Sequence, residues 1–173
     1  QSNLKSLEKL TCHVNYFACK MMPMKQNENQ PGEPSALDLD RQVCHSLYSA
    51  ANALVRAYRQ TLEKLDLTYP QYVVMMSLWQ RDGVSISDLA AHTRFDAGTL
   101  TPLLRRLQDK RLIDVKVAEG DERRKVVSVS RQGRSLKKSA KKVPGQIACA
   151  VDMPAGDALK LKALCETLVE KLK

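Results

Sequence analysis

The sequence predicts a mainly α-helical fold with one small β-hairpin. Between residues 85 and 109, apolar side chains recur every three or four positions in two short segments, as they do on the buried side of a helix. Residues 113–129 instead alternate apolar and polar side chains on either side of a turn, which is the pattern of two paired strands. Two short helices followed by a hairpin are typical of a winged helix-turn-helix, a fold that binds duplex DNA.

The first of these helices is expected to begin at Ser85. The Ser85 hydroxyl, with Asp88 three positions later, matches a capping-box start, in which side chains satisfy free N–H groups of the first turn. Ile86 and Leu89 supply the buried side, and the helix is expected to end near Thr93.

The second helix is the candidate reader helix. Its buried side is a stripe of four leucines: Leu100, Leu103, Leu104 and Leu107. Its start is open. Asp96 as N-cap would leave Pro102 beyond the free amides of the first turn, whereas Thr99 as N-cap would make that proline harmless. We favour an irregular first turn.

The first residues of the second helix of a helix-turn-helix meet base edges in the major groove. Here they are small enough for close approach, and only the threonines offer hydrogen bonds. The expected DNA contacts from this helix are Ala97, Gly98, Thr99, Thr101, Arg105 and Arg106.

The hairpin carries three consecutive cations at its tip, the wing. The outgoing strand covers residues 113–117, the turn falls at 119–122, and the return strand contains 127–129. The wing cations are Arg123, Arg124 and Lys125. Residues 105–142 hold 14 Lys and Arg against 5 Asp and Glu, a surplus equal to the net charge of +9 of the whole chain.

A single-sign field confined to one stretch is the electrostatic footprint of a face that binds a polyanion. A membrane surface is disfavoured because the stretch lacks bulky aromatic residues on an amphipathic helix. Double-stranded DNA is therefore the expected partner.

The bulk properties fit this partner. A chain of 173 residues is long enough for one domain with a real core. The sequence has no run of about 18 apolar residues and no visible signal peptide. Its five cysteines, an odd number, suggest a reducing cytosol, so a cytoplasmic protein is expected and any disulfide would be a switch.

Residues 1–36 are expected to be an extension and a linker that precede the domain. An apolar stripe predicts a further helix over 4–22, and the polar segment 24–35 contains Pro31, Gly32 and Pro34. Three side chains in this helix, Cys12, His13 and Cys19, match no common zinc spacing. No metal site and no cofactor are expected.

A long helix is predicted over residues 37–65, and Pro70 opens the next. One face of the long helix carries a thiol and two phenols: Cys44, Tyr48 and Tyr58. Cys44 and Tyr58 are separated by roughly 21 Å of helix, so they could meet only across a dimer.

Four segments, LDRQVCHSLYSAANALVRAYR, LTYPQYVVMMSLW, FDAGTLTPLLRRLQ and DERRKVVSVS, resemble in order and spacing the organic hydroperoxide resistance regulator (OhrR) branch of the MarR family of winged-helix repressors. The resemblance covers roughly residues 37–150. It implies a domain over 37–173, with the winged helix-turn-helix at about 66–130 and dimerisation helices at about 37–65 and 131–173.

The resemblance also implies a homodimer that binds a pseudo-palindromic operator, with the wing arginine in the minor groove. Asp121 and Arg123 match the D-x-R pattern of the family's wing; without the resemblance they would be an ordinary turn ion pair. Cys44 matches the thiol that reacts with peroxide, and Tyr58 and Tyr69 match the partner-subunit tyrosines that hydrogen-bond it.

In two-cysteine members of this branch a second cysteine forms an intersubunit disulfide with the first, and Cys149 matches that position. The chemistry fits, because a helix N-terminus favours the thiolate and a neighbouring thiol converts its sulfenic acid into a disulfide. Pro144 and Gly145 interrupt the helix before Cys149, however, and a kink there could swing the thiol away.

Each cysteine also has an ordinary interpretation as a packing residue. A lone cysteine on an apolar helix is usually core, and Tyr48 is more often core than participant. Cys165 belongs to an apolar stripe on the last helix and is interpreted as structural, with that stripe packing against the partner subunit.

The function expected from these observations is a homodimeric repressor, not an enzyme, that senses organic hydroperoxides by oxidation of Cys44 and then releases its operator. The alternative is a MarR-like regulator released by a small aromatic ligand, with Cys44 unreactive. A thiol peroxidase would leave the basic wing unexplained. Metal sensing is disfavoured because the three histidines, His13, His45 and His92, are scattered.

Overall fold

A computed structural model describes residues 37–118 and 120–172, except for the side chains of 121–123. The chain divides into two compact units, residues 1–53 and 54–173. The expected helix over 4–22 and the linker after it, with Cys12, His13 and Cys19, lie outside the described residues.

The first unit contains a short 3-10 helix, η1 (Leu39–Arg41), and the beginning of α2 (Val43–Glu63). The long helix was expected from residue 37, but the α-helix begins only at Val43. Gln42 has an extended backbone (φ −88°, ψ 106°), which separates the 3-10 turn from the α-helix. Cys44 is consequently the second residue of α2.

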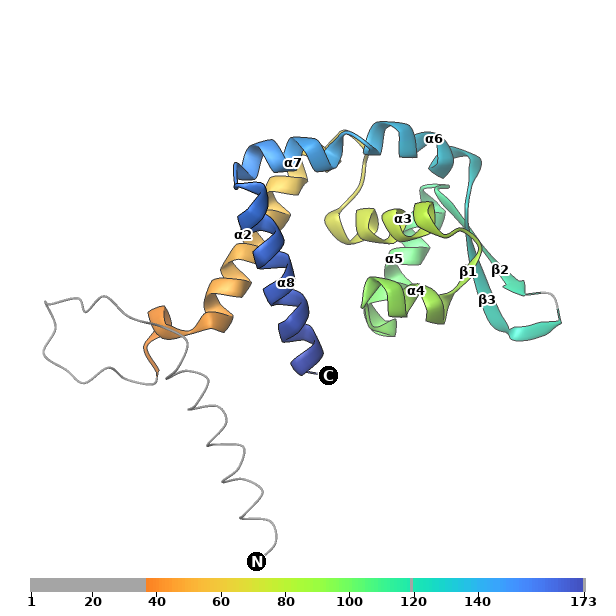
Figure 1. Cartoon of the computed structure of the whole chain (residues 1–173). Coiled ribbons are helices and arrows are strands. Elements are labelled where there is room, and N and C mark those ends of the chain that lie inside the picture. Colours follow the sequence, from red (N-terminus) through yellow and green to blue (C-terminus); the bar gives the residue numbers. More distant parts are fainter. Residues whose placement is uncertain (1–36, 119, 173) are drawn as a thin grey trace, which may run out of the picture. The chain divides into compact units, whose positions relative to one another are not determined.

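The second unit contains the rest of α2 and the winged helix-turn-helix (Figure 1). The elements that follow α2 are α3 (Tyr69–Gln80), β1 (Val84–Ser85), α4 (Ile86–Thr93), α5 (Ala97–Asp109), β2 (Ile113–Ala118), β3 (Asp121–Val129), α6 (Arg131–Ala140), α7 (Val143–Val151) and α8 (Ala155–Lys171). The expected fold class, mainly helical with a small hairpin, is confirmed.

The sheet has one strand more than the sequence predicted. Its order is β1-β3-β2, with both pairs antiparallel. β1 has only two residues, Val84 and Ser85, which pair with Val127 and Val126. Two residues cannot show an alternating pattern, so β1 carries no sequence signal.

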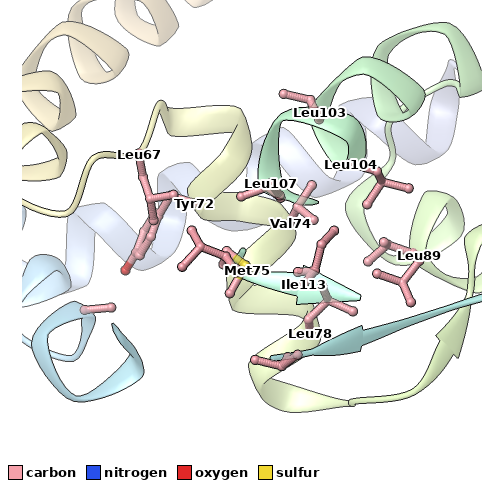
Figure 2. Packing of buried hydrophobic residues seen from close by; sticks show 14 of the residues in the cluster. Leu67, Tyr72, Val74, Met75, Leu78, Leu89, Leu103, Leu104, Leu107 and Ile113 are labelled. Carbon is pink, nitrogen blue, oxygen red and sulfur yellow. The ribbon is translucent and has the colours of Figure 1, made fainter. Parts of the chain in front are cut away.

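Helix α3 is the centre of the core. Thr68 caps its start in a capping box with Gln71, whose side chain accepts from the Thr68 N–H at 3.0 Å. Six α3 side chains are buried, and α3 contacts α4, α5, α6 and β3. Figure 2 shows its apolar side chains packed among those of α4, α5 and β2: Tyr72, Val74, Met75, Leu78, Leu89, Leu103, Leu104, Leu107 and Ile113.

Helix α6 makes a close backbone contact with the loop after α5. A Cβ atom on Gly133 would lie 2.2 Å from the Leu112 carbonyl oxygen and 2.9 Å from Val129 Cγ1. The Gly133 carbonyl accepts a hydrogen bond from Trp79 Nε1 at 2.9 Å. Only glycine allows α6 to sit this close to the winged core.

The helix after the wing was expected to be interrupted near Pro144, and it is. α6 ends at Ala140, and after a turn at 141–142 α7 begins with Pro144 in its first turn, where its missing N–H is tolerated. Among the described residues, no helix is both long and apolar enough to cross a membrane.

We predict that Gly133→Ala lowers the free energy of unfolding by at least about 2 kcal/mol, because the added methyl group must displace backbone. Urea denaturation of the purified protein measures this loss. The matched control is Gly145→Ala in α7, where an added Cβ meets nothing within 4 Å; this variant should be as stable as the wild type or up to about 1 kcal/mol more stable. Equal stabilities of the two variants would contradict the close contact at α6.

Candidate DNA interface and thiol site

The reader helix α5 begins regularly at Ala97, so the expected irregular first turn is wrong. Asp96 is the N-cap: its carboxylate accepts from the Thr99 N–H and from the Thr99 hydroxyl, both at 2.8 Å. Pro102 lies inside the helix, where it cannot donate to the Gly98 carbonyl. The two hydrogen bonds from Thr99 to the Asp96 carboxylate stabilise the turn that Pro102 weakens.

The start of α5 presents a small and exposed surface. Ala97, Gly98, Thr99 and Thr101 are all exposed, as expected for residues that meet base edges. Both threonine hydroxyls donate within the helix, Thr99 to Asp96 and Thr101 to the Ala97 carbonyl at 2.8 Å. In this arrangement each hydroxyl has acceptor lone pairs left for a base or a phosphate-bound water.

The outer side of α5 is basic and its inner side is apolar. Arg105 and Arg106 are exposed. The four leucines of the predicted stripe are buried, which fixes the rotation of the helix on the core: Leu100, Leu103, Leu104 and Leu107.

Helix α4 begins as predicted. The Ser85 hydroxyl accepts from the Asp88 N–H at 3.0 Å and donates to the Asp88 carboxylate at 2.7 Å. This hydrogen bond from Ser85 is the main cause that lowers the pKa of Asp88, and the charges of Arg124 and Arg81 lower it further. The wing cation Arg124 therefore lies within electrostatic reach of the start of α4.

The wing is described in its backbone and in part of its side chains. Arg124 and Lys125 are exposed on β3. Asp121 and Arg123 lie on the same strand, with side chains outside the described residues. Gly120, with φ +81°, forms the turn, and the register between the strands shifts at Val117.

Three free cysteines are described, and two of them are exposed: Cys44 on α2 and Cys149 on α7. Cys44 lies in the first turn of its helix, where the dipole favours a thiolate. Tyr48, one turn later, is 70% exposed, so among the described residues it does not belong to the core. In the described part of the chain, no three His, Cys, Asp or Glu side chains are placed to hold a metal ion.

The second unit gathers the tyrosines into one cluster. The Tyr58 and Tyr69 rings lie 4.8 Å apart, and Tyr58 and Tyr72 lie 6.0 Å apart. Burial, then the neighbouring Tyr69, raises the pKa of Tyr58 above its ordinary value. The Tyr58 phenol is therefore protonated at neutral pH and can donate a hydrogen bond.

Tyr72 was not singled out from the sequence. Its ring is buried among apolar residues at the core end of this cluster, and it stacks edge-on against Trp79 at 6.4 Å. Its position within an apolar run makes it look like packing alone.

Helix α8 is apolar on the outside. It has no buried residue, and of the predicted stripe Leu161 is 45% exposed and Leu172, just after the helix, is 78% exposed. Cys165, on the same stripe, is half-buried. Among the described residues, nothing fully covers the predicted apolar stripe.

Comparison with known proteins identifies the family. The family model described as transcriptional regulator SarA/Rot matches residues 56–140. The organic hydroperoxide resistance transcriptional regulator of Bacillus subtilis (strain 168) is 34% identical over 136 residues, 79% of this chain and 92% of that protein. The chain belongs to the MarR family of winged-helix transcriptional regulators.

Solved MarR-type structures share the fold. Reduced AbfR bound to DNA has a TM-score of 0.67 and 22% identity, covering 78% of this chain and 94% of that one. AbfR with its disulfide formed has a TM-score of 0.56 and 21% identity over 76% and 92% of the two chains. BpsR of Bordetella bronchiseptica, whose DNA binding is regulated by 6-hydroxynicotinic acid, has a TM-score of 0.70 and 24% identity, covering 80% of this chain and 98% of that one.

The cap of the MarR reader helix gives a pH-dependent prediction. Hydrogen bonds from Thr99 lower the pKa of Asp96, so the charged form stabilises the fold. This stabilisation is present above the ordinary carboxyl pKa and is lost as the pH falls through the lowered one. Urea denaturation should show the wild type more stable than Asp96→Asn at pH 7, with the difference shrinking as the pH falls below the ordinary carboxyl pKa of about 4.

Asp96→Ala is the control for this prediction. It removes the acceptor oxygen as well as the charge, so it should be less stable than Asp96→Asn at every pH. A difference between wild type and Asp96→Asn that stays constant from neutral to acid pH would contradict the role of the Asp96 charge.

Proposed function

We propose that this MarR-family regulator is a homodimeric repressor that binds duplex DNA and releases it when an organic hydroperoxide oxidises Cys44. The observation that carries the proposal is the exposed Cys44 thiol in the first turn of α2, in a chain that is 34% identical to an organic hydroperoxide regulator. An exposed thiol at a helix N-terminus is placed for reaction with a peroxide in solution.

DNA is bound by α5 and the wing. The exposed start of α5 suits the floor of the major groove, and Arg105 and Arg106 suit the phosphates beside it. Asp121 orients Arg123 for the minor groove, while Arg124 and Lys125 contact the flanking phosphates. A two-fold dimer then binds a pseudo-palindromic operator, because each half-site meets one reader helix.

The dimer is held by the outer helices. The exposed leucines of α8 would otherwise leave an apolar stripe in water, and a second copy of the same helix is a chemically matched cover. Cys165, half-buried on α8, packs in this interface and has no redox role.

The sensing reaction is a two-electron oxidation. The Cys44 thiolate attacks one oxygen of the hydroperoxide, the O–O bond breaks, and the alkoxide leaves as an alcohol after taking a proton, so Cys44 becomes a sulfenic acid. The Cys149 thiol of the other protomer then attacks the Cys44 sulfur, water leaves, and an intersubunit disulfide forms. Tyr58 and Tyr69 of the partner, with Tyr48 one turn from Cys44, donate hydrogen bonds to the thiolate.

A second candidate is release by a small aromatic acid. A cavity of about 530 Å³ between α3 and α4 combines the Arg81 guanidinium with an apolar floor that includes Leu89. The Ser77 hydroxyl at its wall lies 2.6 Å from His92 Nδ1. A ligand that releases DNA equally from wild type and Cys44→Ser would favour this candidate, whereas release confined to the wild type favours oxidation.

The thiol chemistry is tested with one equivalent of cumene hydroperoxide, a non-reducing gel and intact mass. The wild type should give a dimer that dithiothreitol reduces, Cys149→Ser a monomer that gains one oxygen, and Cys44→Ser no change. Cys165→Ser is the matched control and should behave as the wild type. An unmodified Cys44 in the wild type would remove the sensor role.

The role of the wing is tested by measuring how Arg123→Ala binds a duplex that was selected from random sequences for binding to the reduced protein. Loss of one phosphate or groove contact should weaken binding about tenfold or more and lower the salt slope by about one unit. Lys116→Ala, an exposed cation on β2, is the control and should change affinity less than about threefold. Unchanged affinity and slope for Arg123→Ala would exclude the wing from the mechanism.

A further inference from the structure

Helix α6 and the turn after it carry most of the charge that the sequence assigned to DNA reading. Residues 131–142 hold six Lys and Arg and no Asp or Glu. Residues 105–130, which contain the reader helix and the wing, hold eight Lys and Arg against five Asp and Glu. We call the six cations the α6 stripe: Arg131, Arg134, Lys137, Lys138, Lys141 and Lys142.

The α6 stripe lies on one side of its helix. At about 100° per residue, the six side chains fall within an arc of roughly 140°. All six are exposed. The buried residues Gly133 and Ala140 lie on the opposite side, against the winged core. The side of α6 that carries Arg131 and Lys138 therefore faces away from the core, and the cations at the edge of the stripe can reach back to it.

Helix α4, which leads into the reader helix, lies on the other side of α3 from α6. On α3, Ser77 bonds to His92 of α4, whereas Trp79 donates to the Gly133 carbonyl of α6. Two residues two positions apart project about 200° apart around a helix, so α4 and α6 pack on opposite sides of α3. Figure 1 shows the same order within this unit, with α3 between α6 and α4. The start of α5 follows closely after α4, so a duplex lying there is on the α4 side of α3, away from the α6 stripe.

Two of the six cations already have partners. Arg134 pairs with Asp82 at 3.5 Å and donates to the Val129 carbonyl, and Lys137 donates to the Trp79 carbonyl at 2.7 Å. The other four have no carboxylate within ion-pair distance among the described residues: Arg131, Lys138, Lys141 and Lys142. These four span about 16 Å along α6 and the turn after it, which leaves a row of unneutralised charge.

We propose that the α6 stripe binds the phosphates of a second segment of duplex DNA, so that one protein molecule holds two duplexes. Duplex DNA carries one charge per about 1.7 Å and needs only cations for sequence-independent binding. A protein partner would need apolar or aromatic anchors, which the stripe lacks. A membrane would need a free apolar face, but the apolar side of α6 is buried.

The test compares two variants that lose the same charge. The stripe variant is Arg131→Gln/Lys138→Gln/Lys141→Gln/Lys142→Gln. The control variant changes four exposed lysines on other elements: Lys64→Gln/Lys160→Gln/Lys162→Gln/Lys171→Gln. All eight positions are at the surface, and thermal melting confirms that both variants fold.

Bridging is measured as capture of a fluorescent random-sequence duplex on beads that carry a second random-sequence duplex, with reduced protein at low salt. Wild type and control should capture the fluorescent duplex, and this capture should weaken as salt is added. The stripe variant should capture at least about tenfold less duplex, and its remaining capture should depend less on salt. Fluorescence anisotropy with a single duplex should show that the stripe variant still binds DNA through α5 and the wing.

The outcomes distinguish the second DNA site on the α6 stripe from the proposed DNA binding by α5 and the wing. Equal capture by the stripe variant, no capture by the wild type, or equal loss in the control would overturn the second site. Stripe-dependent binding of phosphatidylglycerol vesicles or of polyglutamate without duplex capture would also overturn it, in favour of a membrane or an acidic protein. A stripe variant that binds no single duplex, although the wild type does, would support the stripe and count against reading by α5.

Discussion

Burial of helix α3 is the constraint on which the rest of the winged unit depends. Six of its twelve residues are buried, only Gln80 is exposed, and α4, α5, α6 and β3 all pack on it. A helix that packs tightly against four neighbours constrains their angles, because the packing leaves them little freedom to shift. The reader helix, the wing and α6 are therefore held as one body whose outer surfaces differ in charge and shape.

These outer surfaces follow from how each helix meets α3. Four leucines turn one side of α5 inward, so its small N-terminal residues and two arginines face outward. Gly133 brings α6 against the loop after α5, so its cations face the other way. Cys44 lies outside this packing, exposed in the first turn of α2, where the helix dipole favours a thiolate.

The fold was largely predictable from the sequence because its signals are local. Leucine spacing located α4 and α5, and alternation located the hairpin. Pro102 is the exception, because its effect on the first turn depends on the Thr99 hydrogen bonds to Asp96, which no periodicity reveals. β1 is too short to show a pattern, and Tyr72 looked like packing in an apolar run.

The sequence predicts which residue types could form a DNA interface and a thiol site, but it does not predict how these residues are arranged in space. The charge surplus is a property of one stretch of sequence, yet four of its cations lie on α6 and two in the turn after it, away from the start of the reader helix. Sequence distance cannot distinguish two faces of one domain, because the side a charge faces depends on which neighbour its helix packs against. The pairing of Cys44 with Cys149 is likewise a matter of dimer geometry, and stays a prediction.

The central claim is that oxidation of Cys44 controls DNA binding. It is tested most directly by fluorescence anisotropy of a selected duplex with wild type and Cys44→Ser, before and after one equivalent of cumene hydroperoxide and again after dithiothreitol. The account predicts that wild type alone loses the duplex and regains it on reduction. If both proteins, or neither, released the duplex after oxidation, the account would be contradicted.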